Sequence, residues 1–372
     1  MRFLLMMTLI LLLILAAPAA AQSDDVATLT NQFDTLVPKL LEQAHVPGAS
    51  MALIHNNEIV WSQGYGLADE DYQTHVTADT VFSVESISKA LTAWEIMRLV
   101  EAGKIDLDAP VNQYLKSWQL TALGRNDPDQ ATIRRILSHT AGLNVDGYRG
   151  FNADTGYLPP LPDFLDGKGN GLQPVQVIIT PGRRFMYSGG GYTILQLMIE
   201  DITGEAFQDV MQTDLLDRLG MTRSKFQWPA GMPNMATSYT TSGNVDSDLV
   251  HEDQAAGGLF TSANDLARFF TLGMTSDWLT PANVALMHTP AEATDEQYFF
   301  GNFLFSLDNG TPVVWHDGIG FGQRSIFFLL PQSGDGLIIL TNKASGNRIF
   351  KDVVCAWDAW LHGDETKLCQ AY

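Results

Sequence analysis

"VFSVESISKALTAW", residues 81–94, places a serine and a lysine, Ser86 and Lys89, three positions apart. If a helix starts at Ser86, the two side chains lie on one face of it, one turn apart. A serine hydroxyl is a poor nucleophile and needs a nearby base, which a lysine can supply. The backbone N–H groups at a helix N-terminus would also help to bind an oxyanion. The segment therefore predicts a nucleophilic serine, although taken alone it also fits a helix cap followed by a surface lysine.

The middle of the chain is dominated by helical patterns. Apolar residues recur at helical spacing through and beyond this segment, at positions 87, 90, 91, 94, 97 and 100, and Gly103 follows as a stop. Further helices are predicted in "ATIRRILSHTAG", in the long run after Tyr187 and in "SANDLARFF". Residues 144–181 are rich in Gly, Pro and Asp. A loop of that length is more often functional than idle.

Strand patterns lie near both ends of the chain. "ASMALIHNNEIVWSQGYG" predicts a hairpin whose turn is at Asn56 and Asn57. Three short strand candidates come late, and the segment "NRIFKDVVCAWDAWL" then predicts a helix packed on them; the strand candidates are "VVWH", "RSIFFLLP" and "GLIILTN". This order predicts an α+β fold, in which both chain ends build an antiparallel sheet flanked by helices and a mostly helical region is inserted between them.

The bulk composition limits the architecture and the partners. A length of 372 residues suits one large domain. We predict that this domain covers residues 22–372, with a sheet part at about 22–80 and 255–372 and a helical part at about 81–254. The net charge of −20 leaves no electrostatic footprint for nucleic acid or an anionic membrane. We therefore expect no nucleic-acid partner.

The N-terminus predicts a secretory signal peptide at residues 1–21. Arg2 supplies a short positive region, residues 3–15 form an apolar run, and three alanines at 19–21 fit a cleavage site. The alternative is an uncleaved membrane anchor. Pro18 and the alanines favour cleavage, and the apolar run is short for a span of about 20 residues. The mature protein is thus expected to be periplasmic or secreted, without a stable membrane span.

The chain has two cysteines, Cys355 and Cys369. In an exported protein they could form a disulfide. Closing a loop of this size would contribute about 3 kcal/mol in the chain-entropy model. Two separate thiols are the alternative. The eight histidines show no H-x-x-x-H or Cys/His cluster, so we expect no metal site and no cofactor.

Further motifs follow the Ser86 segment along the chain. "FMYSGGGYTIL", residues 185–195, has three glycines between two tyrosines. These glycines lack the G-x-x-x-x-G-K-[ST] and G-x-G-x-x-G spacings, so a phosphate-binding loop is not supported. "ILSHTAGLNV" carries His139 and Thr140, and "VVWHDGIGFG" places His316, Asp317 and Gly318 at the end of a strand candidate.

Together these motifs resemble the serine β-lactamase and penicillin-binding-protein superfamily, in its class C β-lactamase-like branch. That branch includes D-alanyl-D-alanine carboxypeptidases, D-aminopeptidases and esterases. The resemblance extends over about residues 26–350 and includes the Gly-Gly turn in "DQAAGGLFTSANDLARFF". S-x-x-K belongs to the motif set of such enzymes. The resemblance implies the β-lactamase/DD-peptidase fold and catalysis through an acyl-enzyme.

The resemblance also implies roles for individual residues. Ser86 would be the acyl-accepting nucleophile, and Lys89 would help to deprotonate it. Tyr187 stands where the family's second motif has the tyrosine that moves a proton between nucleophile and leaving group. The oxyanion hole would consist of the backbone N–H groups of Ser86 and Ile319. The segment around His139 would be structural.

Two positions depart from the family pattern. Gly189 replaces the asparagine of the second motif, which predicts a roomier and less discriminating pocket. His316 and Gly318 belong to the third motif, in which His316 replaces a lysine. A histidine is neutral much of the time at pH 7, so it would bind a substrate carboxylate more weakly than a lysine. Arg324 follows closely and could hold that carboxylate instead.

We therefore expect an exported serine hydrolase that acts through an acyl-enzyme on an amide or ester. The candidate substrates are a D-Ala-D-Ala-type peptide, a D-aminoacyl amide and a small ester. A true class C-like β-lactamase and a catalytically silent penicillin-binding-type receptor stay open as alternatives. The expected partners are small-molecule or peptide substrates, with peptidoglycan fragments among them.

Overall fold

The computed structural model describes residues 19–148, 150–152, 158–168, 173–227, 231–246, 249–273, 278–287, 289 and 298–370. Most of the predicted signal peptide, residues 1–18, lies outside the described residues, so its cleavage stays a prediction. Within the described ranges, no helix combines the length and the apolar character that crossing a membrane requires.

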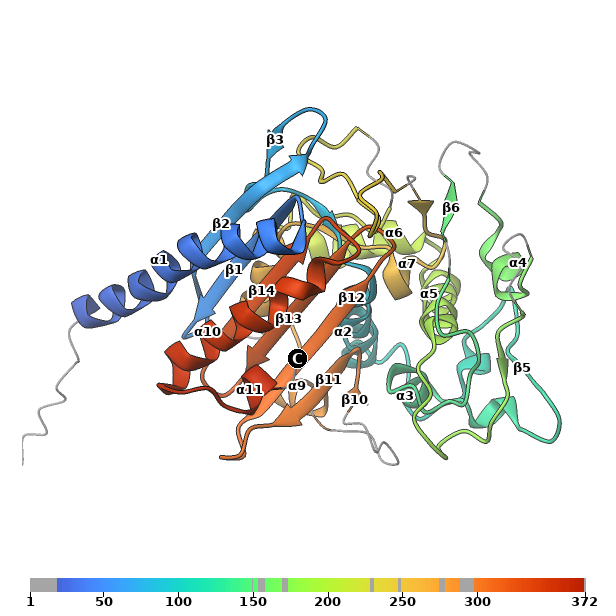
Figure 1. The fold of residues 1–372 in the computed structure, drawn as a ribbon. Coiled ribbons are helices and arrows are strands. Elements are labelled where there is room, and N and C mark those ends of the chain that lie inside the picture. The colour runs from blue at the N-terminus through green and yellow to red at the C-terminus, as the bar shows by residue number, and fades with distance from the viewer. Residues whose placement is uncertain are drawn as a thin grey trace, which may run out of the picture.

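An eight-stranded antiparallel sheet forms the centre of the molecule (Figure 1). Its strand order is β10-β11-β12-β13-β14-β1-β2-β3, so the two ends of the chain meet where β14 pairs with β1. The strands are β1 (Gly48–His55), β2 (Glu58–Asp69), β3 (Thr74–His75), β10 (Tyr298–Phe299), β11 (Asn302–Ser306), β12 (Pro312–Ile319), β13 (Arg324–Leu330) and β14 (Asp335–Thr341).

The turn between β1 and β2 lies at the two asparagines that the sequence indicates. Asn56 and Asn57 have φ values of 53° and 64°, and His55 pairs with Glu58 across the turn. Positive φ at both central residues is typical of a type I′ turn, whose twist matches the flanking strands. Asparagine adopts this conformation more readily than most residues. The predicted hairpin is confirmed.

Alternate residues of the central strands point to opposite sides of the sheet. Both sides are covered, so both sets of side chains are buried. On one face, Leu53, Phe328 and Ile339 pack with α1 (Ala19–Ala44) and α10 (Phe350–His362). On the other face, the neighbouring strand residues join the large core of the helical region; they are Ile54, Phe327 and Ile338. Figure 1 shows α1 and α10 lying across the same side of the sheet.

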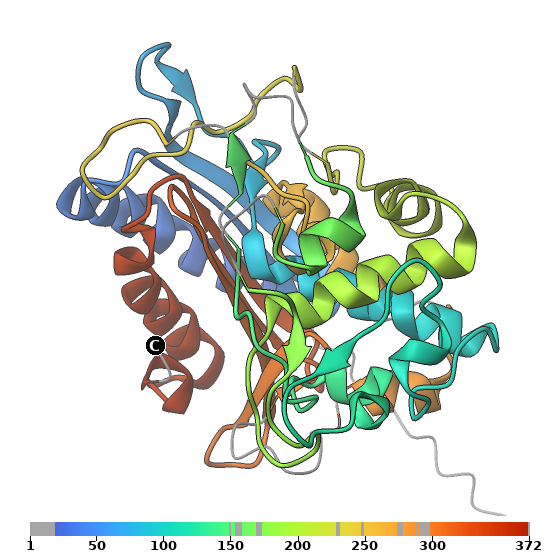
Figure 2. The same ribbon diagram turned by 90° about the vertical axis from the view of Figure 1, so that its right-hand side faces the viewer.

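The helical region covers the opposite side of the sheet (Figure 2). Its main helices are α2 (Ser88–Glu101), α3 (Ile133–Leu137), α4 (Leu161–Leu165), α5 (Gly189–Thr203), α6 (Phe207–Met211), α7 (Gln254–Gly257), α8 (Ala263–Arg268) and α9 (Pro281–Met287). Short strand pairs lie between them: β4 (Phe82–Ser83) with β9 (Phe260–Thr261), β5 (Thr121–Ala122) with β7 (Gln176–Val177), and β6 (Phe151–Asn152) with β8 (Leu249–Val250).

The sequence patterns locate α2 and miss α1. In α2 the predicted apolar face is buried at Leu91, Trp94 and Met97, and Gly103 beyond the helix has a φ of 67°. The sequence analysis did not predict α1, although Leu29, Phe33, Val37 and Leu41 recur every four residues and are buried. The predicted fold class is confirmed: an antiparallel sheet flanked by helices, with a mostly helical region between its early and late strands. The predicted bounds of the sheet and helical parts stay a prediction.

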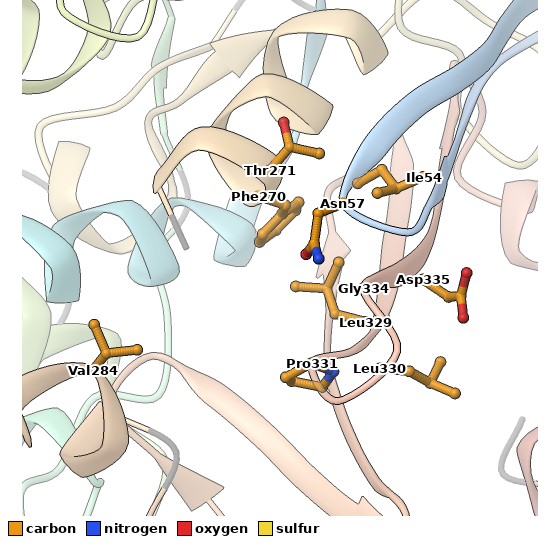
Figure 3. A pocket seen from close by; sticks show the side chains of 10 residues that line it. All are labelled: Ile54, Asn57, Phe270, Thr271, Val284, Leu329, Leu330, Pro331, Gly334 and Asp335. Carbon is orange, nitrogen blue, oxygen red and sulfur yellow. The ribbon is translucent and has the colours of Figure 1, made fainter. Parts of the chain in front are cut away.

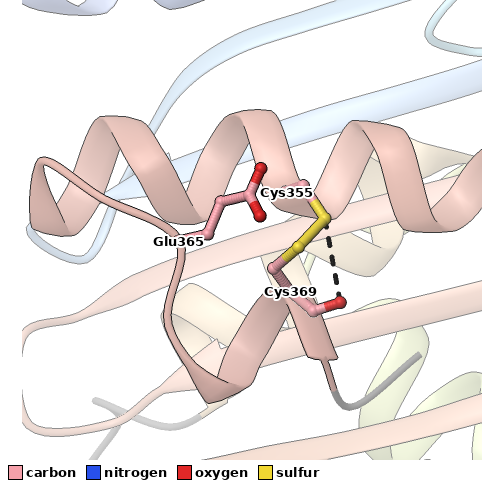
Figure 4. A group of neighbouring side chains, drawn as sticks. All are labelled: Cys355, Glu365 and Cys369. Atoms are coloured by element: carbon pink, nitrogen blue, oxygen red, sulfur yellow. Dashed lines mark hydrogen bonds between the residues drawn. A yellow bond between two sulfur atoms is a disulfide. The ribbon is translucent and has the colours of Figure 1, made fainter.

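A disulfide joins the last two helices (Figure 4). Cys355 in α10 is bonded to Cys369 in α11 (Lys367–Gln370). The Glu365 carboxylate lies near the two sulfur atoms, and within the described residues this is the group whose spacing could suit a metal ion. Since the sulfur atoms are bonded to each other, they offer no pair of thiolates. The group therefore acts as a covalent link between the helices.

Removing the disulfide should destabilise the protein. With Cys355→Ala and Cys369→Ala together, we expect the free energy of unfolding to fall by about 3 kcal/mol, because the unfolded chain regains the freedom of a loop of this size. Urea unfolding under oxidising conditions measures the difference. The wild-type protein with reductant should approach the double variant. Unfolding curves that coincide without reductant would contradict the prediction.

Candidate active site

Ser86 lies in a single 3-10 turn, Glu85–Ile87, that leads directly into α2. The turn is fixed at Val84, whose N–H donates to Leu259 O over 3.0 Å and whose carbonyl accepts from Ser325 Oγ over 3.1 Å. Glu85 has a φ of 50°, in the left-handed region that few side chains occupy. This conformation presents the half-buried Ser86 between the sheet and the helical region.

Ser88 stabilises the same turn through two hydrogen bonds of its side chain. Its hydroxyl donates to the carbonyl of Glu85 over 2.5 Å and accepts from the N–H of Leu259 over 3.0 Å. Ser88 is fully buried, so both hydrogen bonds are shielded from water. Ser88 thus holds Glu85, the residue with positive φ that precedes Ser86.

The side chains of Lys89 and Tyr187 meet at the Ser86 hydroxyl. Lys89 Nζ donates to Ser86 Oγ over 3.1 Å, and Tyr187 OH donates to the same oxygen over 2.8 Å. The structure therefore brings together the three residues predicted to be catalytic, although Tyr187 is 101 positions away from Ser86. Both distances lie within the range expected between a nucleophile and its base.

Lys89 is almost completely buried, with 2% of its surface exposed. Its ammonium group also donates to the carbonyl of Ala256 over 2.5 Å. It lies 5.0 Å from the centre of the Tyr187 ring and 5.6 Å from that of Tyr192. A buried charge needs such partners, because an unpaired charge inside a protein is very costly. Ala256 immediately precedes the Gly-Gly turn noted in the sequence, and its contact with Lys89 was not predicted.

The glycine run after Tyr187 forms the start of α5. Ser188 is the N-cap of this helix, and its hydroxyl accepts from the N–H of Gly191 over 3.0 Å. The same hydroxyl donates to the carbonyl of Asn144 over 2.7 Å. Tyr187 therefore immediately precedes the cap of a helix that is bonded to the loop starting at residue 144. The Tyr187 hydroxyl points to Ser86.

Gly189 lies close against the loop backbone, and the predicted effect on the pocket stays a prediction. A β-carbon at this position would lie 3.0 Å from Asp146 O and 3.3 Å from Gly147 Cα. The backbone N–H of Gly189 donates to Asp146 O over 2.9 Å. The loop backbone therefore crowds the position of a β-carbon, and the glycine allows this close approach.

The third motif lies on β12, and the Ser86 turn packs against it. A β-carbon at Gly318 would be 2.2 Å from both Val84 O and Ser325 Oγ, so this position is filled. The next residue, Ile319, is 65% exposed and pairs with Arg324 on β13. The close approach at Gly318 brings the end of β12 beside the turn that carries Ser86.

His316 is buried and neutral. Its surface is 1% exposed, its Nδ1–H donates to Asp317 O over 2.6 Å, and its Nε2 lies 3.5 Å from Tyr298 OH. Burial, and then the charge of Lys89, lower the pKa of His316 to about 3. An imidazole without charge forms no ion pair with a substrate carboxylate. The sequence analysis expected weak carboxylate binding here, and the structure leaves no ionic contribution from His316.

Arg324 is the first residue of β13, directly after the turn that follows the third motif. Its guanidinium donates to the carbonyls of Gly320 and Gln323, the latter over 2.9 Å. Its charge opposes the burial that raises the pKa of Asp317. The Arg324 side chain thus stabilises the β12–β13 turn. It is not among the groups that donate to Ser86 Oγ in the described structure, which are Lys89 and Tyr187.

A buried ionic cluster next to the nucleophile was missed. His251 Nδ1 lies 3.2 Å from Asp253 Oδ1. Burial lowers the pKa of His251, but the hydrogen bond and the charge of Asp253 outweigh it and raise the pKa to about 9. Burial raises the pKa of Glu85, and the charge of His251 partly offsets this rise. No spacing rule in the sequence connects residue 85 with residues 251–253.

A cavity of about 290 Å³ lies away from this site (Figure 3). It is bounded by the β1–β2 turn at Asn57, the β13–β14 turn at Gly334, and the side chains of Phe270 and Leu329. Leu330 and Arg324 are at opposite ends of β13. Since a strand rises about 3.3 Å per residue, the cavity is roughly 20 Å from the end of β13 that faces Ser86.

Adding a methyl group at Gly318 should damage the site. In Gly318→Ala the new carbon would collide with two atoms at 2.2 Å, so β12 must shift away from Val84. We expect a loss of about 1–3 kcal/mol of stability. Acylation should slow by about 10²- to 10³-fold, because the N–H of Ile319, the expected oxyanion donor, would move with β12. Gly147→Ala, where no atom lies within 4 Å of the new carbon, is the matched control. Equal acylation rates of the two variants would contradict this assignment.

The buried His316 should make stability sensitive to acid. Its pKa of about 3 is below the ordinary value of 6.5, so the unfolded chain takes up the proton first. Stability should therefore be unaffected by this group above pH 6.5 and fall below it, by about 1.4 kcal/mol per pH unit, until the pH nears 3. His316→Asn keeps a donor for the Asp317 carbonyl and does not titrate. Urea unfolding between pH 7.5 and 4.5 should show a shallower loss for the variant; parallel curves would refute the prediction.

Comparisons with known sequences identify the family of this chain. The family described as Beta-lactamase matches residues 33–353. Protein flp of Staphylococcus aureus (strain NCTC 8325 / PS 47) is 25% identical over 328 residues, which cover 84% of this chain. The chain spans 62% of the length of protein flp. Penicillin-binding protein 4 of Amycolatopsis lactamdurans is 28% identical over 365 residues and is covered to 88%, as is this chain.

Solved structures show the same fold. The octameric penicillin-binding protein homologue from Pyrococcus abyssi has a TM-score of 0.74 at 22% identity, covering 90% of this chain and 78% of the other. The β-lactamase/D-alanine carboxypeptidase from Pseudomonas syringae has a TM-score of 0.73 at 18% identity, covering 91% and 99%. With a family match over most of its length and this fold around Ser86, the chain belongs to the β-lactamase family.

Proposed function

We propose that the protein is an exported serine hydrolase that acts through an acyl-enzyme on an amide or ester. The observation that carries the proposal is the position of Ser86 Oγ, with Lys89 Nζ at 3.1 Å and Tyr187 OH at 2.8 Å. Acyl transfer needs a nucleophile, a base and a proton donor at one point. Membership of the β-lactamase family supports the assignment.

The geometry supports a two-stage reaction. In the reactive state Tyr187 has lost its hydroxyl proton to water, and the neighbouring Lys89 ammonium stabilises the phenolate. Ser86 Oγ then forms a bond to the substrate carbonyl carbon and passes its proton to the Tyr187 oxygen. The bond to the leaving amine or alcohol then breaks, and the leaving group takes the proton from Tyr187. Water attacks the resulting ester, and the same groups return a proton to Ser86. The products are an acid and the free enzyme.

The oxyanion that forms during both stages needs two N–H donors. The backbone N–H groups of Ser86 and Ile319 are the proposed pair, because the turn of Ser86 packs against β12 at Gly318. Preorganised donors of this kind often provide the largest single contribution to the rate. Ile319 is exposed, so a substrate can reach this end of β12.

The charges around the site favour a substrate without a carboxylate near the scissile bond. His316 is neutral, and the Arg324 guanidinium is bonded to carbonyls of its own turn. Small esters and D-aminoacyl amides are therefore our first candidates. Similarity to the β-lactamase/D-alanine carboxypeptidase of Pseudomonas syringae keeps a D-Ala-D-Ala-type peptide, a peptidoglycan fragment or a β-lactam as second candidates. The complete set of Ser86, Lys89 and Tyr187 argues against a silent receptor.

Export rests on two features. The N-terminal pattern of a positive residue, an apolar run and three alanines is typical of a signal peptide. The Cys355–Cys369 disulfide suits an oxidising compartment, since disulfides are rare in reducing cytosol. A periplasmic or secreted location follows from both.

A fluorophosphonate probe tests the nucleophile. The wild-type protein should be labelled at Ser86, and Ser86→Ala should take no label because the attacking oxygen is gone. Ser242→Ala, which changes an exposed serine on a loop, is the matched control and should be labelled like the wild type. Equal labelling of wild type and Ser86→Ala would show that Ser86 is not the nucleophile.

The substrate class is tested by parallel assays of the mature protein. The panel contains short p-nitrophenyl esters, a D-aminoacyl anilide, a D-Ala-D-Ala peptide and a chromogenic cephalosporin. We expect esters and the anilide to be turned over fastest, because they bring no carboxylate that the neutral His316 would have to bind. Fast cephalosporin turnover with inert esters would reverse this ranking.

A further inference from the structure

His139 holds the backbone on both sides of Tyr187. Its carbonyl accepts from the N–H of Met186 over 2.7 Å, and its Nδ1 accepts from the N–H of Ser188 over 3.1 Å. These two amides are the neighbours of Tyr187 in the chain. His139 is 2% exposed, so water does not compete for either bond. A single residue of the helical region thus fixes the segment that carries the proton-transferring tyrosine.

The imidazole ring of His139 also packs on the Tyr187 ring. The ring centres are 4.3 Å apart, the shortest spacing among the contacts of the His139 ring with its aromatic neighbours. Tyr298 at 4.7 Å and Tyr192 at 5.3 Å enclose the imidazole from other sides. The position of the Tyr187 ring is therefore set by a packed neighbour, which in turn is held by two further rings.

The electrostatic surroundings keep the imidazole of His139 neutral. Burial, then the charge of Lys89 and the neighbouring His316, lower the pKa of His139 well below its ordinary value. The other titratable groups that face the ring are the phenols of Tyr187, Tyr192 and Tyr298. Since Nδ1 accepts a hydrogen bond, the proton resides on Nε2, which has no partner among the described residues. A protonated Nδ1 could not accept from Ser188.

Position matters at this point because the Tyr187 hydroxyl must stay 2.8 Å from Ser86 Oγ. A displacement of about 1 Å in a catalytic group can reduce a rate by about 10²-fold. The backbone of His139 is itself in the left-handed region, with a φ of 56°. Asparagine is one of the few other residues that adopt this conformation readily.

We propose that His139 is a positioning residue for Tyr187, acting through two backbone hydrogen bonds and the contact between the rings. The inference rests on the proposed function only in naming the reaction that Tyr187 serves. His139 touches neither Ser86 nor a substrate in this role. It aligns the tyrosine, and the tyrosine moves the proton.

The rate of fluorophosphonate labelling at Ser86 tests the proposal. His139→Ala should slow labelling by about 10²-fold, because the ring and the Nδ1 acceptor are lost. His139→Asn keeps an acceptor for Ser188 N–H and suits the φ of 56°, so it should recover part of the rate. His55→Asn is the matched control: it disrupts the bond of a half-buried histidine to Asp335, which does not touch Tyr187, and labelling should stay within about twofold.

A double-mutant cycle separates positioning from general damage. If His139 acts through Tyr187, then His139→Ala combined with Tyr187→Phe should label no more slowly than Tyr187→Phe alone. Losses that multiply would overturn the proposal, as would a folded His139→Ala that labels at the wild-type rate. If His139→Ala does not fold, His139→Asn and its combination with Tyr187→Phe provide the same comparison.

A crystal structure of the His139 variant distinguishes this inference from the proposed function. We expect Tyr187 OH to be displaced from Ser86 Oγ in the variant and unmoved in His55→Asn. An undisplaced tyrosine would overturn the inference even if the wild-type protein is labelled. A wild-type protein that takes no label would overturn the proposed function, while a displaced Tyr187 would still support the positioning role of His139.

Discussion

The buried ammonium group of Lys89 is the interaction on which the rest of the site depends. A charge with 2% exposure is tolerated only where the surrounding groups replace water. Its partners come from three separate places: Ser86 in the preceding turn, the Ala256 carbonyl in α7, and the rings of Tyr187 and Tyr192 at the start of α5. One charge therefore joins these elements beside Ser86 Oγ.

The two buried histidines that feel the charge of Lys89 are neutral. His139 and His316 are both enclosed, and for both of them the charge of Lys89 adds to burial in lowering the pKa. The protonated histidine of the site, His251, lies instead beside Asp253 and Glu85. Lys89, whose ammonium lies 5.0 Å from the centre of the Tyr187 ring, can therefore stabilise a Tyr187 phenolate without help from either buried histidine.

Sequence reasoning located the parts of the site that depend on local spacing. Ser86 and Lys89 are three positions apart in a helical pattern, and the Asn56–Asn57 turn has a well-known signature. Tyr187 was found through resemblance, because no local rule connects it to Ser86. Two features depend on tertiary contacts and were not predicted. The loop backbone lies close to Gly189, and His139 contacts the Tyr187 ring and accepts a hydrogen bond from the next residue, Ser188. The helix α1 had a visible four-residue period that the signal-peptide pattern beside it obscured.

The placement of α1 and α10 has a practical meaning. Both helices cover one side of the sheet, whereas the Ser86 turn and α2 lie on the other side, with the helical region (Figures 1 and 2). A tag, a fluorophore or a solid support attached through α1 or α10 would be separated from Ser86 by the full thickness of the sheet. In an immobilised protein, the side of the sheet that carries Ser86 would then face away from the support.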